Sequence, residues 1–166
     1  MSHTISKALG LGALLVTASA FAQPEYVRIE MEIDVDAPAA DVWDKVGGYC
    51  DISVWFPQLD CEITSGDGGM GTVRVLAGGR VTEILVALTE LSYGYTQPAV
   101  EGQFYDLYHG FMEARPVTDN TSKILYTLVY DASNFEDQAA IDADIERRRG
   151  QFTGALQNMK DLVEGN

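Results

Sequence analysis

Apolar and polar side chains alternate along most of the chain between residues 26 and 131, as in strands that bury one face. The clearest example is the segment 26–35, in which every second residue is a valine, isoleucine or methionine. Because most connections between the strand-like segments are short, the pattern predicts an antiparallel meander of seven strands. The other six segments lie at about 59–64, 72–76, 80–88, 93–97, 105–115 and 122–131.

Helical spacing interrupts the alternation at two short places after the first strand. Pro38 stands at the favoured first position of a helix with one apolar side, and the glycines that follow end this helix. Its buried side would consist of Val42, Trp43 and Val46. A second short helix is expected at about 49–55, closed by a proline.

One long amphipathic helix is predicted near the C-terminus, at roughly 133–163. Apolar side chains recur there at helical spacing from Ile141 to Val163. Ser133 and Glu136 suggest a capping box at its first turn. A single helix laid across one curved sheet cannot fill the concave side. We therefore expect an α+β fold, a curved seven-stranded antiparallel sheet with two short helices and a long C-terminal helix over a cavity.

The glycine pair at 78–79 predicts a two-residue hairpin and so sets the register of the strands on either side. This register places Arg74 directly opposite Glu83, on the same face as Leu76. If that face is concave, a charged pair lies inside the container. The alternative is a slipped register with the pair exposed on the surface.

Residues 1–22 have the features of a secretory signal peptide. Lys7 precedes an apolar run, and the small residues at 20–22 suit signal peptidase. The run is too short for a stable membrane anchor, and the alternative reading is a disordered, slightly apolar N-terminus. We expect cleavage after Ala22, a single domain over 23–166, and a periplasmic or secreted location.

Composition narrows the classes of partner and cofactor. The net charge of −14 argues against nucleic acid and anionic lipid as partners, because both are negatively charged and are repelled by an acidic protein. Gly66, Gly68 and Gly71 spell a dinucleotide fingerprint, but a strand follows them where a phosphate site needs a helix. His109 is the only histidine after residue 22, so the metal-binding set is poor. We expect no metal, no cofactor and no stable membrane insertion.

Cys50 and Cys61 are the only cysteines in the chain. In an oxidising compartment they could form a disulfide, and the alternative is two small thiols buried near each other. The spacing leaves both readings open, because it does not show whether the two Cβ atoms face each other.

Aromatic residues gather on the faces expected to be concave. In the segment 105–115, Asp106, Tyr108 and Gly110 share one face, and His109 points to the other. The tyrosines would offer apolar walls with hydroxyl groups that orient a ligand, although they could also simply fill a core. The candidate ligand contacts are Trp55, Phe56, Tyr95, Tyr108, Tyr126 and Tyr130.

Several motifs in this order resemble the polyketide cyclase/dehydrase and lipid-transport family of the SRPBCC, or START-like, superfamily. The resemblance implies a helix-grip fold around a cavity, in a family of binding proteins, cyclases and hydratases. Family members typically carry Trp-His-Pro where this chain has Trp-Phe-Pro, so any polar role of that histidine is absent here. The residues that carry the resemblance are Gly48-Tyr49-Cys50, Trp55-Phe56-Pro57, Cys61, Gly66–Gly71, Arg74, Gly78-Gly79 and Glu83.

Three functional hypotheses follow. The first is a periplasmic protein that binds a small hydrophobic ligand, aromatic or polycyclic, in the cavity. The second is a cofactor-independent cyclase, isomerase, dehydratase or lyase, in which Glu83 and Asp106 carry protons and Arg74 stabilises negative charge. Arg74 and Glu83 could instead form a purely structural ion pair. The third hypothesis is an accessory protein that docks to a periplasmic partner.

Overall fold

The computed structural model describes residues 24–101 and 104–165. The predicted signal peptide at 1–22 lies outside the described residues. The order of elements is one strand, two short helices, six strands and one long helix. The strands are β1 Tyr26–Val35, β2 Cys61–Ser65, β3 Val73–Leu76, β4 Val81–Leu88, β5 Ser92–Gln97, β6 Tyr108–Thr118 and β7 Thr121–Asp131. The helices are α1 Ala39–Val46, α2 Ile52–Trp55 and α3 Gln138–Glu164.

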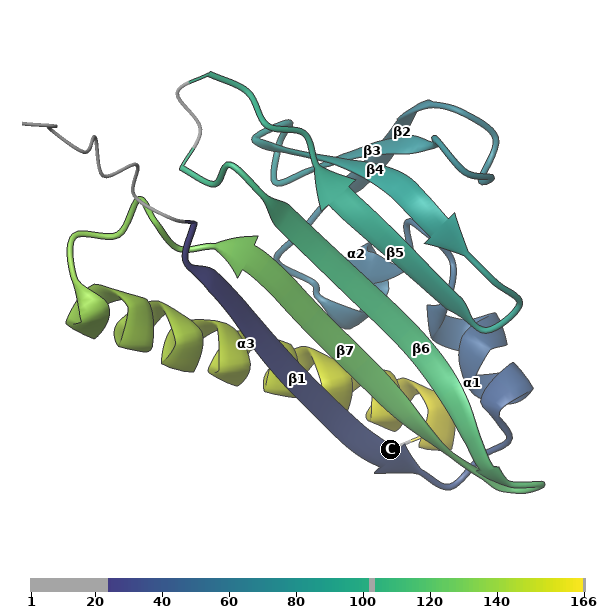
Figure 1. Ribbon diagram of the computed structural model, residues 1–166. Helices are drawn as coiled ribbons and strands as arrows, with labels where there is room; N and C mark the ends of the chain where they lie inside the picture. The colour runs from purple at the N-terminus through teal and green to yellow at the C-terminus, as the bar shows by residue number, and fades with distance from the viewer. Residues whose placement is uncertain (1–23, 102–103, 166) are drawn as a thin grey trace, which may run out of the picture.

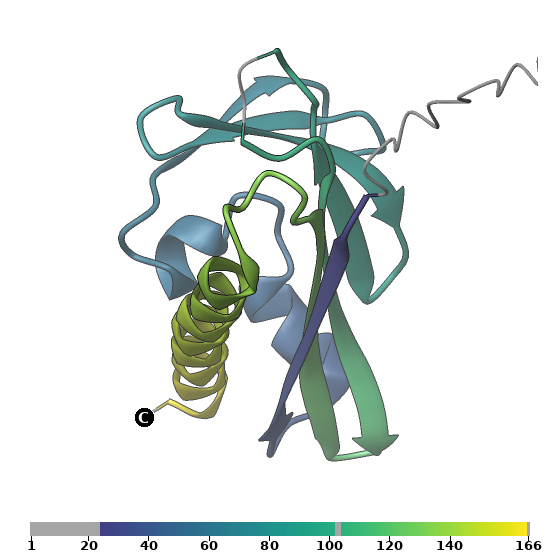
Figure 2. The ribbon, with the colours of Figure 1, turned by 60° about the vertical axis from the view of Figure 1, so that its left-hand side comes forward.

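The strands form one antiparallel sheet in the order β1-β7-β6-β5-β4-β3-β2 (Figure 1). The long helix α3 lies across one face of this sheet, and the end formed by β2, β3 and β4 curls over above it (Figure 2). The two short helices lie on the same side as α3. This arrangement confirms the predicted α+β helix-grip fold.

The hydrophobic core lies between the concave face of the sheet and the helices. Alternate residues of β1 and β7 are buried, as the period of two predicts for strands with one covered face. The predicted apolar stripe of α1 is also confirmed, since Val42 and Val46 are fully buried and Trp43 packs against the core. His109 lies on the sheet face opposite to Tyr108, beside Phe111, as the alternation predicts.

The glycine pair after β3 produces the predicted register. Gly78 and Gly79 both have positive φ angles, of 67° and 85°, which side-chain-bearing residues rarely adopt. Leu76 pairs with Val81, and Arg74 pairs with Glu83. The slipped alternative is therefore excluded, and the charged pair lies on the concave face.

The start of α3 differs from the prediction. The helix begins at Gln138, and its N-cap is Asp137, whose side chain accepts a hydrogen bond from the Ala140 amide at 2.8 Å. Ser133 is not the cap, because its hydroxyl donates to the Asp131 carboxylate and accepts from the Glu25 amide. The five residues after β7 thus form a turn that the helical spacing does not reveal.

Cys50 and Cys61 form a disulfide, which resolves the question that the spacing left open. The bond ties the segment before α2 to the first residue of β2 across a sequence separation of 11. Closing a loop of this size stabilises the folded state by about 3 kcal/mol. The closed loop carries Trp55 and Phe56, so the disulfide also constrains the position of these two aromatic residues.

Candidate functional site

A cavity of about 440 Å³ lies between the concave face of the sheet and the middle of α3. We call it the inner cavity. Most of its wall is apolar or aromatic, and its polar groups come from β4, β5, β6, α3 and the loops that carry Gln58 and Tyr105. Its lining consists of Ile52, Phe56, Gln58, Leu59, Leu76, Val81, Glu83, Tyr95, Gln97, Tyr105, Tyr108, Arg147, Arg148, Gln151 and Phe152.

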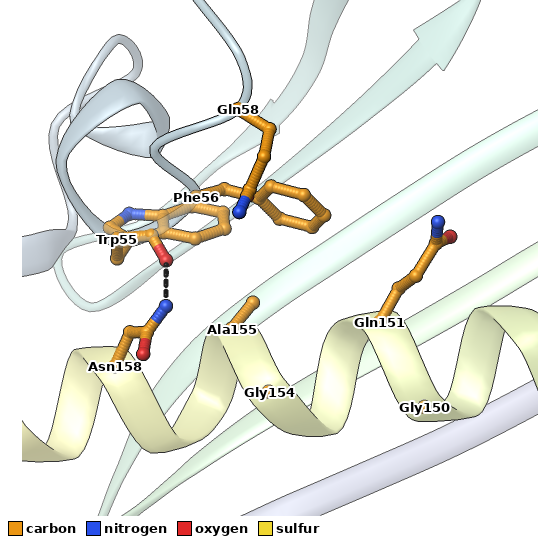
Figure 3. A pocket seen from close by; sticks show the side chains of 8 residues that line it. All are labelled: Trp55, Phe56, Gln58, Gly150, Gln151, Gly154, Ala155 and Asn158. Carbon is orange, nitrogen blue, oxygen red and sulfur yellow. Dashed lines mark hydrogen bonds between the residues drawn. The ribbon is translucent and has the colours of Figure 1, made fainter.

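A second hollow of about 440 Å³, here called the outer cleft, lies between the end of α2 and α3 (Figure 3). Gly150 and Gly154 line it without side chains, and a Cβ at either position would meet nothing within 4 Å. Phe56, Gln58 and Gln151 line both hollows. These three side chains therefore lie at the boundary between the outer cleft and the inner cavity.

The end of α2 and the residue after it contact α3 at the outer cleft. The Asn158 side chain donates to the carbonyl of Trp55 at 3.0 Å (Figure 3). The indole of Trp55 is fully buried and donates to the Val46 carbonyl at 3.3 Å. Phe56 packs edge-on against Phe152 of α3, with 5.9 Å between ring centroids. The aromatic side chains of this segment thus bridge the helix and the core.

A row of polar residues crosses the concave face at one level of the sheet. Arg74 pairs with Glu83, Gln97 pairs with Tyr108, and Tyr108 pairs with Tyr130. The Gln97 side chain joins the two halves of the row by donating to Glu83 Oε1 at 3.3 Å. Glu83, Gln97 and Tyr108 line the inner cavity, so the row forms its polar floor.

Arg74 is completely buried behind Glu83. Its Nε and Nη2 both donate to Glu83 Oε2, at 2.9 and 2.6 Å, and its Nη1 donates to the Tyr49 carbonyl. Its guanidinium carbon lies 4.2 Å from the ring centre of Tyr49 and 5.1 Å from that of Tyr95. Arg74 does not line the inner cavity. The predicted role of stabilising negative charge on a ligand therefore has no direct contact in this structure.

Glu83 lines the inner cavity, and its two carboxylate oxygens have different hydrogen-bond partners. Burial raises the pKa of this carboxyl, although the charge of Arg74 and the hydrogen bonds from Arg74 and Gln97 act in the opposite direction. Both hydrogen bonds from Arg74 go to Oε2 of Glu83, and Oε1 accepts only the 3.3 Å bond from Gln97. Glu83 is thus a buried carboxylate that lines the cavity and has one weakly held oxygen.

A second buried arginine comes from α3 and was not predicted from the sequence. Arg148 donates from Nε to Asp144 Oδ2 at 2.7 Å, from Nη1 to the Tyr108 hydroxyl at 2.8 Å, and from Nη2 to the Tyr105 hydroxyl. Its guanidinium lies 4.7 to 5.0 Å from the ring centres of Tyr105, Tyr108 and Tyr130. The only sequence signal is an Asp–Arg pair four residues apart, which is usually a solvated helix pair.

The tyrosine hydroxyls of the site remain protonated at neutral pH. Burial raises the pKa values of Tyr95, Tyr108, Tyr126 and Tyr130, and in Tyr108 the charge of Arg148 opposes this rise. A protonated phenol both donates and accepts a hydrogen bond. Tyr95 and Tyr108, which line the inner cavity, can therefore orient a ligand, and none of the four residues acts as a base at neutral pH.

The predicted aromatic contacts divide into two groups. Phe56, Tyr95 and Tyr108 line the inner cavity, and Trp55 lines the outer cleft. Tyr126 and Tyr130 lie on the predicted face but line neither hollow. Both are fully buried; Tyr126 packs against Trp55 and Phe152, and Tyr130 against Tyr105 and Tyr108. For these two residues the alternative reading, core packing, describes their position.

Asp106 does not reach the inner cavity. The strand β6 begins at Tyr108, so the predicted alternation stops before Asp106, which lies exposed in the preceding loop. It is not among the residues that line the inner cavity. The position expected for a second proton carrier is therefore not occupied by this carboxylate, and Glu83 is the carboxylate that faces the cavity.

Gly110 makes room for Tyr95, a close approach that the sequence does not signal. The two residues are paired across β5 and β6, and a Cβ at Gly110 would lie 2.2 Å from the Tyr95 ring. The ring therefore lies directly over the backbone of β6, where its hydroxyl hydrogen-bonds the Tyr126 hydroxyl at 2.9 Å. The glycine thereby sets the position of one wall of the inner cavity.

Among the residues that the structure describes, no cluster of three or more histidine, cysteine or carboxylate side chains could hold a metal ion. Within the same residues, no helix is both long and apolar enough to cross a membrane. The chemistry available at the site consists of Glu83, the tyrosine hydroxyls, three glutamines and the arginines of α3.

Comparison with known proteins identifies relatives at the level of family and fold. The family model described as polyketide cyclase / dehydrase and lipid transport matches residues 26–164. No curated protein matches this sequence. Similar solved structures include a protein of Thermobifida fusca, with 25% identity, a TM-score of 0.69, and coverage of 82% of this chain and 92% of that one.

Two other similar structures are enzymes by name. The Zhui aromatase/cyclase of a Streptomyces species has 17% identity and a TM-score of 0.66, over 84% of this chain and 94% of its own. A point mutant of the norcoclaurine synthase of Thalictrum flavum, in complex with a transition-state analogue, has 18% identity and a TM-score of 0.60. That match covers 86% of this chain and 97% of the synthase. At these identities the likeness shows a shared fold.

Proposed function

Because the chain belongs to the polyketide cyclase / dehydrase and lipid transport family, we propose that it binds a small aromatic ligand in the inner cavity. The observation that carries this proposal is the open volume of about 440 Å³ beneath α3. Cavities of roughly 300–1,000 Å³ with mostly apolar walls and a few polar groups are typical of small-molecule sites.

The wall suits a flat ring better than an acyl chain. Phe56 and Phe152 meet edge-on at one side, and Tyr95 and Tyr108 form part of the sheet side. Aromatic pairs gain about 0.5–1.5 kcal/mol beyond their buried area when they stack or meet edge to face. The polar floor around Gln97 would then fix the orientation of the ring.

A large side chain at the boundary between the two hollows is expected to weaken binding. In the variant Gln151→Trp, an indole stands at the boundary between the outer cleft and the inner cavity, so the affinity for a two-ring probe should fall by about tenfold or more. The probe is neutral 2-naphthamide, and the measurement is isothermal titration calorimetry. The matched control is Gln157→Trp, because Gln157 is exposed on the same helix and bonds only Asp161.

The control variant should bind 2-naphthamide as the wild type does. The proposal is wrong if the wild type does not bind the probe, or if both tryptophan variants bind it equally well. Because both positions are exposed on α3, neither variant removes a core contact, and thermal unfolding measured by circular dichroism would verify that both are folded.

A cofactor-independent acid/base enzyme is the second candidate function, and the position of Glu83 favours it. A buried carboxylate with a raised pKa, lining a ligand cavity and with one oxygen held only by a 3.3 Å hydrogen bond, is the arrangement that a general base requires. Arg74 would act through Glu83 by holding its other oxygen. The reaction would be a proton transfer at carbon, as in cyclisation, isomerisation, dehydration or lyase cleavage.

Export is also part of the proposal. The Cys50–Cys61 disulfide supports it, since such bonds persist mainly in oxidising compartments. Mass spectrometry of the protein isolated from its own cells is expected to give a chain that begins at Gln23 and is found in the periplasmic or secreted fraction. A full-length chain retained in the cytoplasm with both thiols reduced would contradict it.

A further inference from the structure

The charge on the wall of the inner cavity has the opposite sign to the charge of the whole protein. Three charged side chains line the cavity: Glu83 from the sheet, and Arg147 and Arg148 from α3. The chain as a whole has a net charge of −14. A net positive wall within such an acidic protein attracts an anion to the cavity and not to the rest of the surface.

The two arginines share one carboxylate. Asp144 accepts from Arg148 through Oδ2 and from Arg147 through Oδ1. Its pKa is lowered; burial acts to raise it, but the hydrogen bonds and charge of Arg148 outweigh that effect. Asp144 is therefore ionised at neutral pH and neutralises one guanidinium. One positive charge remains at this end of the cavity.

Arg148 is held in a fixed orientation with donors to spare. Its contacts with Asp144, Tyr108 and Tyr105 use one N–H on each of its three nitrogens. A guanidinium carries five N–H groups, so two remain for another acceptor. Because three tyrosine rings surround this side chain, little conformational entropy is lost when a ligand binds it.

Arg147 provides the more exposed half of the same wall. Its side chain is 52% exposed, and its Nη1 donates to Gln151 Oε1 at 3.0 Å. Gln151 stands between the outer cleft and the inner cavity. Arg147 is therefore the exposed guanidinium of this wall, and Arg148 is the buried one.

The opposite end of the cavity carries no net charge. Glu83 is paired with Arg74, which lies behind it with all three of its nitrogens engaged. A ligand that spans the cavity would meet a neutral ion pair at the sheet and a single positive charge at the helix. Rings of Phe56, Phe152 and Tyr95 line the space between.

We infer that Arg147 and Arg148 form a subsite for a carboxylate and that the ligand is an aromatic monocarboxylic acid. This inference rests on the proposed binding function and adds the acid group to it. Planar guanidinium groups match the geometry of a carboxylate, and a monoanion balances the single uncompensated charge.

The test compares two probes of the same shape by calorimetry on the full-length mature protein. The acid 2-naphthoate is expected to bind about tenfold or more tightly than the neutral amide 2-naphthamide. In the variant Arg147→Gln this preference should fall to about threefold or less, and Arg147→Lys should restore part of it. Since the side chain of Arg147 is half exposed, the substitution is expected to leave the fold intact.

The matched control is Arg149→Gln, which removes the same charge from the neighbouring position. Arg149 is exposed, donates to the Glu30 carbonyl at 3.3 Å, and does not line the inner cavity. Its removal should leave the preference for 2-naphthoate unchanged. Equal loss in both variants would overturn the subsite in favour of a general charge effect.

The two proposals fail in different ways. Equal affinity of the wild type for 2-naphthoate and 2-naphthamide overturns the carboxylate subsite and leaves the binding function in place. If neither 2-naphthoate nor 2-naphthamide binds, the binding function itself is contradicted.

Discussion

Replacing Arg74 by methionine is expected to lower the free energy of unfolding by about 3–5 kcal/mol at neutral pH. The substitution removes the cation from a buried pair and leaves Glu83 only 3% exposed, with Gln97 as its remaining hydrogen-bond partner. It also removes the donor to the Tyr49 carbonyl. Urea denaturation followed by tryptophan fluorescence would measure the loss.

The pH dependence of this loss follows from the raised pKa of Glu83. A carboxyl whose folded-state pKa lies above its unfolded value favours folding at low pH, and this contribution is lost as the pH rises through the folded value. Without Arg74 the folded pKa rises further, because the main opposing charge is gone. The loss of unfolding free energy caused by Arg74→Met should therefore be small at pH values below the ordinary pKa of a glutamate. It should reach its full size at pH values above the pKa of Glu83 in the folded variant.

Two control variants separate the buried pair from ordinary surface charge. The double variant Arg74→Met with Glu83→Leu should recover most of the lost stability, since a buried ion pair is often replaced by apolar residues at little net cost. Arg115→Met breaks an exposed pair with Glu113 and should change stability little. If Arg74→Met lowers the free energy of unfolding as little as Arg115→Met does, the Arg74–Glu83 pair does not stabilise the β3–β4 end of the sheet.

The variant Glu83→Gln is expected to slow proton exchange at carbon by about 10²–10⁴-fold if the cavity runs acid/base chemistry. The probe is 2-tetralone, a bicyclic ketone with an acidic C–H bond next to its carbonyl. Glu83 would take this proton, the bonding electrons would pass into the enolate, and a deuteron from the solvent would replace it. Proton NMR in D₂O follows the exchange, and calorimetry would show that 2-tetralone still binds.

The matched control is Asp106→Asn, a carboxylate replaced by its amide outside the inner cavity. Exchange catalysed by this variant should equal that of the wild type. If Glu83→Gln catalyses exchange as fast as the wild type, Glu83 is not the base and the enzymatic alternative loses its central residue. The binding function would be unaffected by that result.

Local rules were sufficient to predict the sheet and its charged pair. The alternation in β1 gives its bounds, 26–35, because each apolar residue there faces the same core. The glycine pair at 78–79 fixes the register of β3 and β4, and through it the pairing of Arg74 with Glu83. Hairpin register depends on residues adjacent in sequence, so it can be read from the chain.

Contacts between distant segments could not be predicted in this way. Arg148 is buried only because α3 crosses β6 and β7 at the level of Tyr108 and Tyr130, and nothing within α3 specifies that crossing. The packing of Tyr95 on Gly110 is likewise a contact across two strands. Alternation assigns Tyr126 to the concave face but does not show that Trp55 and Phe152 fill the space over it.

The ends of elements were the other source of error. Asp106 was assigned to a strand that begins two residues later, and Ser133 to a cap that Asp137 provides. In both places a loop continues the apolar or polar pattern of its neighbour, so periodicity alone does not mark the boundary.

A crystal structure of the protein with bound 2-naphthoate tests the central claim most directly, because the account depends on open space between the sheet and α3. The account predicts the naphthalene ring among Phe56, Tyr95 and Phe152, with its carboxylate against Arg147 and Arg148. Electron density showing that side chains of α3 fill this space, with the acid absent or bound elsewhere on the surface, would contradict it.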